Sequence, residues 1–575
     1  MYNPIKDKQY LFSTYVPPDN NAYGHDAVIV SLLDSNTNEP SLHIIENPDV
    51  QIYVTRDGLR TYKYKKEYEP IQNLDMYICP YKEMFDRYGE ILNMRRFEPN
   101  QISRFVARSP YCYGWDIDIT TKVKLEYTES CSKPIGHISK GALDIETSVL
   151  GDNQIICASV AVWDRREVHC FILETWLSNK TGETIIELNK RTEQEYAQFA
   201  DGLNDIAKAI WDKQPPTVKY HFCKDEKTLL KMLLACINYF KINAIGIWNM
   251  EYDIPYIMRR AEFRQLDLAE LFCHKDVPAK YRYFKWNEDR SKPDHFSETW
   301  HTVSCPGYTF YYDAMCLYSR LRKVKGKEIS YTLDYIGNKI VGTGKMKFGT
   351  GATHYEMQTN DKIGYCVYNT LDTVLPMLMD DVTGDVLSML MLLGPSEIGD
   401  FNKQTVQLKN QFYVYLLENK CIPGSVRGSI ALDTDKYIGN IGGAVLNPIL
   451  MREKGLACLK ESNVTSSIYK DVCDLDVSSF YPSITIAFNV SKETKLGTVL
   501  YMDGCPYTLK EIEKASSNDI RKEMTVANAE YICRYFGRIT CVEENAIAIC
   551  HEYFNLPNYS EMLSLFQSSI LRPCT

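Results

Sequence analysis

The chain has 575 residues, of which 45% are hydrophobic and 24% are charged, and its formal net charge at pH 7 is −9. This length predicts several domains with large hydrophobic cores, because a single core stops growing near about 250 to 300 residues. The sequence implies no membrane-spanning helix, since no apolar run reaches the roughly 18 residues that such a span needs. The acidic balance argues against a simple nucleic-acid coat protein.

The 19 cysteines form no C-x-x-C pair, and the first residues, MYNPIKDKQYLFSTY, lack the basic head and apolar stretch of a signal peptide. These features disfavour a zinc ribbon or a disulfide framework. We therefore expect reduced, packed thiols in a cytoplasmic protein, and the cytoplasm is that of an infected bacterium if the protein is viral.

The chain begins with short β-like runs separated by Pro and Asn, which predict a mixed, β-rich α+β domain over residues 1–135. Over residues 136–385, strands alternate with helices, which is typical of α/β architecture. Within this region, a helix is expected behind a capping box of Thr192 and Glu195, and a second helix is expected over residues 226–240.

Two acidic side chains mark the first strand of the α/β region. In ALDIETS, Asp144 and Glu146 are two residues apart, so their side chains leave the same face of a strand. Such a pair can bind a hard divalent cation. A solvated strand face carries the same pattern, and the pair alone does not separate the two interpretations.

Two further acidic elements follow along the chain. Asp253 comes four residues after Asn249 at a predicted strand-to-helix turn, where a helix N-cap is the alternative interpretation. Tyr368 and Asp372 are one turn apart on a predicted helix, at the border of its apolar stripe. A carboxylate at such a border is costly to desolvate unless it is paired or binds a metal ion.

The order of these elements is Asp-x-Glu on a strand, Asn-x-x-Tyr-Asp at a turn and Tyr-x-x-x-Asp on a helix. It resembles the three exonuclease motifs of proofreading DNA polymerases, whose domain is ribonuclease H-like. The resemblance implies two Mg²⁺ or Mn²⁺ ions about 4 Å apart, with Tyr368 orienting the attacking water or the scissile phosphate and Asn249 contacting DNA. The implied metal ligands are Asp144, Glu146, Asp253 and Asp372.

A later stretch, CDLDVSSFYPS, alternates like a half-buried strand and ends in a turn of small residues. It resembles the first palm motif of family B DNA polymerases, Asp-x-x-Ser-Leu-Tyr-Pro-Ser. The resemblance implies that Asp476 binds the polymerase metal ions, that the backbone after it cradles a triphosphate, and that a tyrosine excludes a 2′-hydroxyl. The implied nucleotide-binding residues are Ser478, Ser479, Phe480 and Tyr481.

Neighbouring segments extend the resemblance, which is strongest to T-even-like bacteriophage polymerases over residues 309–348 and 489–499. The IGGAV stretch is similar to the Tyr-x-Gly-Gly motif that guides the primer end between sites, with Asn440 in the place of the tyrosine. By this resemblance, Gly442 and Gly443 contact DNA.

Residues 386–575 are expected to form an incomplete palm with a helical insert, because the fingers motif and the later Asp-Thr-Asp hairpin are not recognised. LDTDKY lies before the palm motif and is interpreted as a turn, while KASSN lacks the Tyr-Gly of the fingers motif. The expected fold class is therefore multidomain α/β and α+β. A ribonuclease H-like 3′→5′ exonuclease domain lies between the β-rich N-terminal domain and the beginning of the palm.

The expected function is that of a family B DNA-directed DNA polymerase with proofreading activity, either the N-terminal portion or one subunit of a split enzyme, in viral DNA replication. Its substrates are primer–template DNA and deoxynucleoside triphosphates. A second chain would carry the fingers, thumb and remaining palm, including the carboxylate that shares the palm metal ions, and would contact a sliding clamp. A truncated chain or an interrupted gene would give the same sequence. The alternatives are an autonomous exonuclease with a remnant palm and a non-catalytic DNA-binding subunit.

Overall fold

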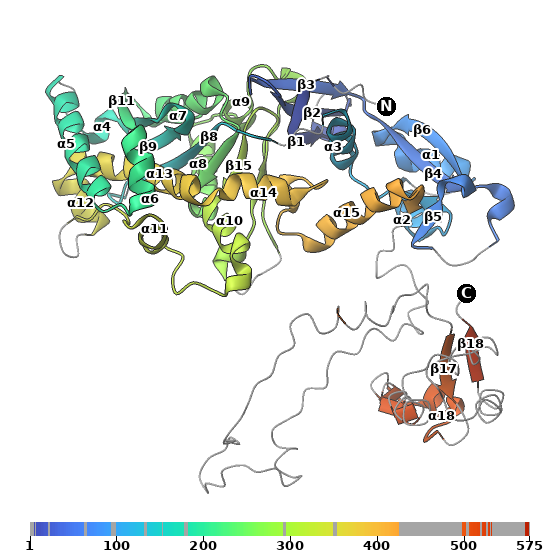
Figure 1. The fold of residues 1–575 in the computed structure, drawn as a ribbon. Coiled ribbons are helices and arrows are strands. Elements are labelled where there is room, and N and C mark those ends of the chain that lie inside the picture. The colour runs from blue at the N-terminus through green and yellow to red at the C-terminus, as the bar shows by residue number, and fades with distance from the viewer. Residues whose placement is uncertain are drawn as a thin grey trace, which may run out of the picture. The chain divides into compact units, whose positions relative to one another are not determined.

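In the computed structural model, the chain forms two compact units, Met1–Leu432 and Asp433–Thr575 (Figure 1). The predicted division at residues 135 and 385 stays a prediction. The described residues are 5, 7–20, 24–61, 66–93, 99–131, 135–151, 153–177, 182–290, 295–348, 353–424, 483, 497–501, 505–517, 520, 521, 523, 524, 527, 528, 531 and 570–573.

The N-terminal part of the first unit combines small sheets with three helices. Strands β1, β2 and β3 form an antiparallel sheet, and β4 pairs with β6 and β7 in a second sheet. Side chains from both sheets and from the helices share one core, in which Tyr88 and Tyr127 are fully buried. The elements are β1 (Lys8–Val16), β2 (Ala27–Asp34), β3 (Pro40–Glu46), β4 (Asp49–Thr55), β5 (Tyr68–Pro70), β6 (Leu74–Pro80), β7 (Cys112–Tyr113), α1 (Met84–Ile91), α2 (Pro99–Arg108) and α3 (Ile119–Ser130).

A six-stranded sheet is the centre of the first unit, in the order β11-β10-β9-β8-β12-β15. Strand β9 runs antiparallel to β8 and β10, and the other neighbouring pairs are parallel. Every residue of β9, IICASVAV, is buried, as expected for a strand covered on both faces. The strands are β8 (Lys140–Thr147), β9 (Ile155–Val162), β10 (Glu167–Leu173), β11 (Thr217–Cys223), β12 (Ala244–Ile247) and β15 (Phe310–Asp313).

Helices cover both faces of this sheet and enclose two hydrophobic cores. The core that contains Ala142 of β8 also contains Leu371, whereas Leu143 and Ile145 belong to the core that contains Leu230. The helices of this region, with one short hairpin, are α4 (Glu174–Leu177), α5 (Gly182–Asp201), α6 (Asp205–Lys213), α7 (Glu226–Phe240), α8 (Met250–Phe263), α9 (Leu268–Phe272), β13 (Lys285–Asn287), β14 (Thr302–Ser304), α10 (Ala314–Leu321), α11 (Leu333–Val341), α12 (His354–Asn360), α13 (Lys362–Thr383) and α14 (Asp385–Leu393).

Two expected helices have different outcomes. The prediction for residues 226–240 is confirmed, because α7 has these bounds and Asp225 caps it by accepting the Thr228 backbone N–H. The predicted capping box at Thr192 is wrong, because α5 begins at Gly182 and runs through this residue. The Thr192 hydroxyl donates instead to the Leu188 carbonyl oxygen at 2.7 Å, an alternative that mid-helix threonines have.

Helix α13 packs against β8, β9 and β10 (Figure 1) and is buried on all sides. The sequence predicts an apolar stripe with Asp372 at its border, and this detail is wrong, because every residue from Gly364 to Asp380 is buried. Helices α5, α6, α11 and α12 cover the side of α13 that faces away from the sheet. Periodicity alone could not show that its polar positions, such as Asn369, are also enclosed.

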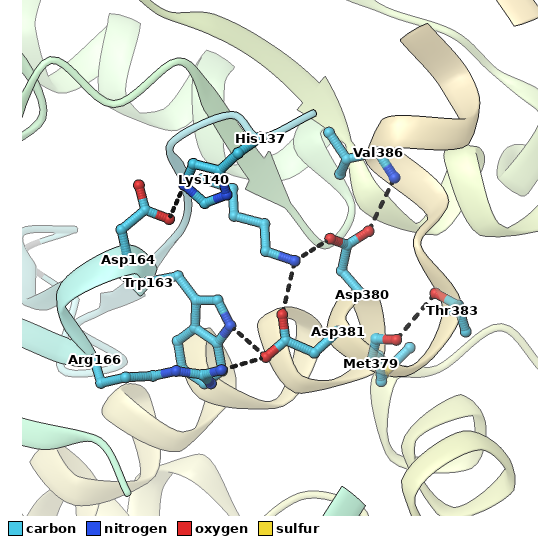
Figure 2. Close-up of polar contacts among 10 residues, drawn as sticks. All are labelled: His137, Lys140, Trp163, Asp164, Arg166, Met379, Asp380, Asp381, Thr383 and Val386. Atoms are coloured by element: carbon cyan, nitrogen blue, oxygen red, sulfur yellow. Dashed lines mark hydrogen bonds and ion pairs between the residues drawn. The ribbon is translucent and has the colours of Figure 1, made fainter. Parts of the chain in front are cut away.

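The C-terminal end of α13 is bound to the start of β8 by a polar cluster (Figure 2). Lys140 of β8 forms ion pairs with Asp380 at 2.5 Å and with Asp381 at 2.8 Å. Asp381 also accepts hydrogen bonds from Arg166 at 2.7 Å and from the Trp163 indole at 2.8 Å. The cluster therefore sets the position of α13 along β8. Together, α13 and β8 carry most of the acidic residues considered below.

A buried carboxylate joins α7 to α8. The Glu226 side chain accepts two hydrogen bonds from Arg260, one from Arg264 and one from the Ile155 backbone N–H, all between 2.6 and 2.8 Å. Burial alone would raise the Glu226 pKa, but these donors bring it below its ordinary value.

We expect Glu226→Ala to lower the free energy of unfolding by about 3 kcal/mol, because it removes the buried carboxylate that accepts hydrogen bonds from both Arg260 and Arg264. Urea unfolding followed by tryptophan fluorescence measures this loss. The control is Glu90→Ala, which removes an exposed pair with Arg87 and should cost less than about 1 kcal/mol. Equal losses in the two variants would contradict the structural role of Glu226.

The remaining described elements are short or peripheral. Strand β16 pairs with β5, so the chain returns to the N-terminal sheets after α15. In the second unit, β17 pairs with β18. Within the described residues, no helix is both long and apolar enough to cross a membrane, and the described cysteines are free thiols, most of them buried. The elements are α15 (Gln404–Glu418), β16 (Cys421–Pro423), β17 (Gly497–Tyr501), α18 (Leu509–Lys514) and β18 (Ile570–Pro573).

Candidate metal centre

Three carboxylates meet where α13 packs against β8. Asp144, Glu146 and Asp372 each place an oxygen atom within 4.8 Å of the other two. The two β8 residues leave the same face of their strand, as their spacing predicts, and that face carries Ala142 into the core shared with α13. The structure thus brings together three of the four predicted ligands.

Asp253, the fourth predicted ligand, lies at the edge of this group and is not a member of it. It occupies the first turn of α8 and is 4% exposed. The backbone N–H of Ile145 donates to the Asp253 carboxylate, whose charge raises the Asp144 pKa, while the Glu146 charge raises the pKa of Asp253. Asp253 therefore contributes negative charge to the site from a second helix.

The alternative interpretation of Asp253 as a helix N-cap is wrong, because Asn249 holds that position with a left-handed backbone (φ 71°). The Asn249 side chain forms no capping hydrogen bond. The Met250 backbone N–H is satisfied instead by the buried carboxylate of Asp313 at 2.7 Å. The Asn249 side chain thus takes no part in capping α8, and its predicted contact with DNA stays a prediction.

Burial and mutual repulsion disfavour the ionised forms of the cluster. Burial, then the charges of Asp372 and Glu146, raise the Asp144 pKa well above its ordinary value, and burial with the charge of Glu146 does the same for Asp253. Burial and the Asp372 charge raise the Glu146 pKa to about 7. A bound cation would relieve this repulsion. Relief of the repulsion therefore favours cation binding to the ion-free site.

One cation, Lys345, reaches the cluster from the turn that follows α11. Its Nζ lies 2.6 Å from Asp372 Oδ2 and donates to the Tyr368 hydroxyl, also at 2.6 Å. The Asp334 carboxylate holds this turn by accepting the Lys345 backbone N–H at 2.9 Å. Lys345 was not among the site residues predicted from the sequence. It lies inside the polymerase-like segment 309–348, but a single lysine has no spacing pattern that would single it out.

Tyr368 lies beside the acidic cluster, as its position one turn before Asp372 predicts. Its hydroxyl accepts from Lys345 and donates to Asp372, and its ring stacks on Tyr365 with centroids 5.8 Å apart. The hydroxyl is therefore held between a cation and a carboxylate at the rim of the cluster.

The donor set fits Mg²⁺ or Mn²⁺. These hard ions prefer carboxylate oxygens, and every member of the cluster is a carboxylate. Asp372 is 3% exposed, and its Oδ1 has no hydrogen-bond partner among the described residues. An unpaired carboxylate oxygen at such a depth is costly, and coordination to an ion would satisfy it.

The polymerase half of the prediction lies outside the described residues. This applies to the palm aspartate, to the nucleotide-binding residues and to the two glycines expected to contact DNA. These residues are Asp476, Ser478, Ser479, Phe480, Tyr481, Gly442 and Gly443.

We expect Glu146→Gln to stabilise the ion-free protein at pH 8 by up to about 3 kcal/mol, since one pKa unit corresponds to about 1.4 kcal/mol. The folded state raises the Glu146 pKa from 4.5 to about 7, so the unaltered protein loses stability as the pH rises through this range. Urea unfolding in EDTA at pH 8 and pH 4.5 measures the effect, which should nearly vanish at pH 4.5. A variant less stable than the unaltered protein at pH 8 would contradict this account.

Comparison with known proteins supports one relationship. No protein-family model matches the chain. The chain is 25% identical over 289 residues to DNA polymerase 120R of Invertebrate iridescent virus 3, and the match covers 47% of this chain and 22% of that polymerase. It is thus distantly similar to a viral DNA polymerase and spans about a fifth of that relative's length.

Proposed function

We propose that residues 136–385 form the 3′→5′ exonuclease domain of a family B DNA polymerase, which removes mismatched nucleotides from a primer end during viral DNA replication. The group of Asp144, Glu146 and the buried Asp372, with Asp253 beside it, is the observation that carries the proposal. The distant similarity to a viral DNA polymerase supports the polymerase context.

The proposal includes a ribonuclease H-like fold for this domain. Its support is the strand order β10-β9-β8-β12-β15, in which β9 alone of these described strands runs opposite to the rest. The acidic residues also follow the expected topology, because they lie on the central strand β8 and on helices that pack beside it.

Different residues of the chain have different roles in the proposed phosphodiester hydrolysis. Two Mg²⁺ or Mn²⁺ ions, held by Asp144, Glu146, Asp253 and Asp372, would supply an activated water and stabilise the leaving 3′ oxygen. Lys345 adds a fixed positive charge at the rim, where a phosphate diester is attracted to it. Tyr368, held by Lys345, places a hydroxyl at the same rim and can orient the scissile phosphate or the water.

For the palm, we propose the nucleotidyl-transfer role that the DLDVSSFYPS motif implies, with primer–template DNA and deoxynucleoside triphosphates as substrates. Its support is the motif itself together with the viral polymerase similarity. The second chain, the sliding clamp and the split arrangement stay predictions.

The test uses the purified full chain and a 5′-labelled primer with a mismatched 3′ end on its template. The chain and the primer–template are incubated with Mg²⁺ or with EDTA, each with and without the four deoxynucleotides. We expect Mg²⁺-dependent shortening, with or without nucleotides. Binding of the primer–template without shortening would favour a non-catalytic subunit, and extension past the mismatch would show that the chain polymerises alone.

A further inference from the structure

Asn369 is a residue of α13 whose buried side chain contacts the acidic cluster. Its side chain is fully buried, and its amide Nδ2 donates to Asp144 Oδ2 at 2.6 Å. The opposite end of the same amide, Oδ1, accepts the Ser159 hydroxyl at 2.5 Å and the Cys157 thiol at 3.4 Å. An amide oxygen only accepts hydrogen bonds and the amide NH₂ only donates them, so the Ser159 and Cys157 donors at Oδ1 leave the NH₂ group to face Asp144.

Tyr365 makes the equivalent contact with Glu146, one helical turn earlier. Its hydroxyl donates to Glu146 Oε2. The hydroxyl oxygen is held in turn by Gln358 Nε2 at 3.2 Å and by His354 Nδ1 at 3.0 Å. Each β8 carboxylate therefore has a donor on α13, and each donor has its own support.

The two contacts occur in register because α13 runs antiparallel to β8. Four residues of helix, from Tyr365 to Asn369, rise about 6 Å, and two residues of strand, from Glu146 to Asp144, advance about 6.7 Å. The ion pair between Lys140 and Asp380 continues the same antiparallel order at the far end (Figure 2). The packing of helix on strand thus presents one donor to each carboxylate.

We propose that Asn369 and Tyr365 are positioning residues that set the orientation of Asp144 and Glu146 for a divalent cation. Each hydrogen bond occupies one carboxylate oxygen and restricts the side chain's rotation, which leaves Asp144 Oδ1 and Glu146 Oε1 for the ion. The inference rests on the proposed function of the same site. Hydrogen-bonding partners of metal ligands typically change metal affinity or activity by about 10- to 100-fold when removed.

If the role of Asn369 were purely structural, a different result would be expected. If Asn369 only satisfied buried polar groups, its removal would lower stability without a selective effect on ion binding. The control is Tyr196→Phe, which removes another buried hydroxyl that contacts α13, because Tyr196 donates to Thr370 at 3.1 Å and touches none of the carboxylates.

The experiment measures Mn²⁺ binding to the full chain by electron paramagnetic resonance, with thermal unfolding on the same samples. We expect Asn369→Ala and Tyr365→Phe each to weaken Mn²⁺ binding by about 10- to 100-fold, and Tyr196→Phe to leave it unchanged. Exonuclease rates should recover to within a few-fold of the unaltered protein at saturating Mn²⁺.

Unchanged Mn²⁺ affinity in the folded variants would overturn the positioning role while leaving the exonuclease proposal intact. An unaltered protein that binds no Mn²⁺ would overturn both. If Asn369→Ala does not fold, Ser159→Ala takes its place, because it keeps Asn369 and removes only the hydroxyl that orients it. Ser159→Ala is then expected to weaken Mn²⁺ binding several-fold, and an unchanged affinity overturns the role of Asn369.

Discussion

Asp144→Ala is expected to reduce Mg²⁺-dependent shortening of a mismatched primer by about 1,000-fold or more. Asp144 is the centre of the acidic group, because Asp372, Glu146 and Asp253 all act on its pKa. Its loss removes one of the three oxygen donors that lie within 4.8 Å of one another. The single-turnover rate on a 5′-labelled primer at saturating enzyme measures this effect.

The matched control for Asp144→Ala is Asp201→Ala, which removes a carboxylate that is 83% exposed at the end of α5. The control should retain the rate of the unaltered protein. Thermal unfolding of both variants separates a lost site from a lost fold. If Asp144→Ala kept more than a tenth of the activity while folded, the metal centre would have to lie elsewhere.

Lys345→Met is expected to lower the single-turnover rate of primer shortening by about 100-fold at pH 7, through two effects of the lost charge. The ammonium group lies 2.6 Å from Asp372 Oδ2 and opposes the rise that burial causes in the Asp372 pKa. Without it, Asp372 takes up a proton at a higher pH and becomes a poorer ligand. The phosphate also loses a charge-assisted contact.

The pH dependence identifies the first of these effects. We expect the acid side of the rate profile to move to higher pH in Lys345→Met, so that part of the activity returns at pH 9. Lys347→Met, which changes the exposed lysine two residues further along the same turn, should leave both the rate and the profile unchanged. A uniform loss at every pH would mean that Lys345 acts on the phosphate alone.

Elements with a local pattern could be predicted from the amino-acid sequence alone. Period-2 spacing placed Asp144 and Glu146 on one face of a strand, and apolar spacing predicted α7 to the residue. These signals are local because side-chain direction in a strand or helix follows from backbone geometry alone. The order of three weak motifs then carried the polymerase resemblance, which no single motif could do.

The groups that surround the carboxylates could be identified only from the three-dimensional structure. Asn369 contacts Asp144 across 225 positions of sequence, and Lys345 contacts Tyr368 across 23, from a turn without a periodic pattern. Asp372 was expected at the border of an apolar stripe, but it is only 3% exposed, because α13 packs against the sheet and against other helices. Burial and long-range contacts depend on how distant elements pack, and local periodicity contains no information about that packing.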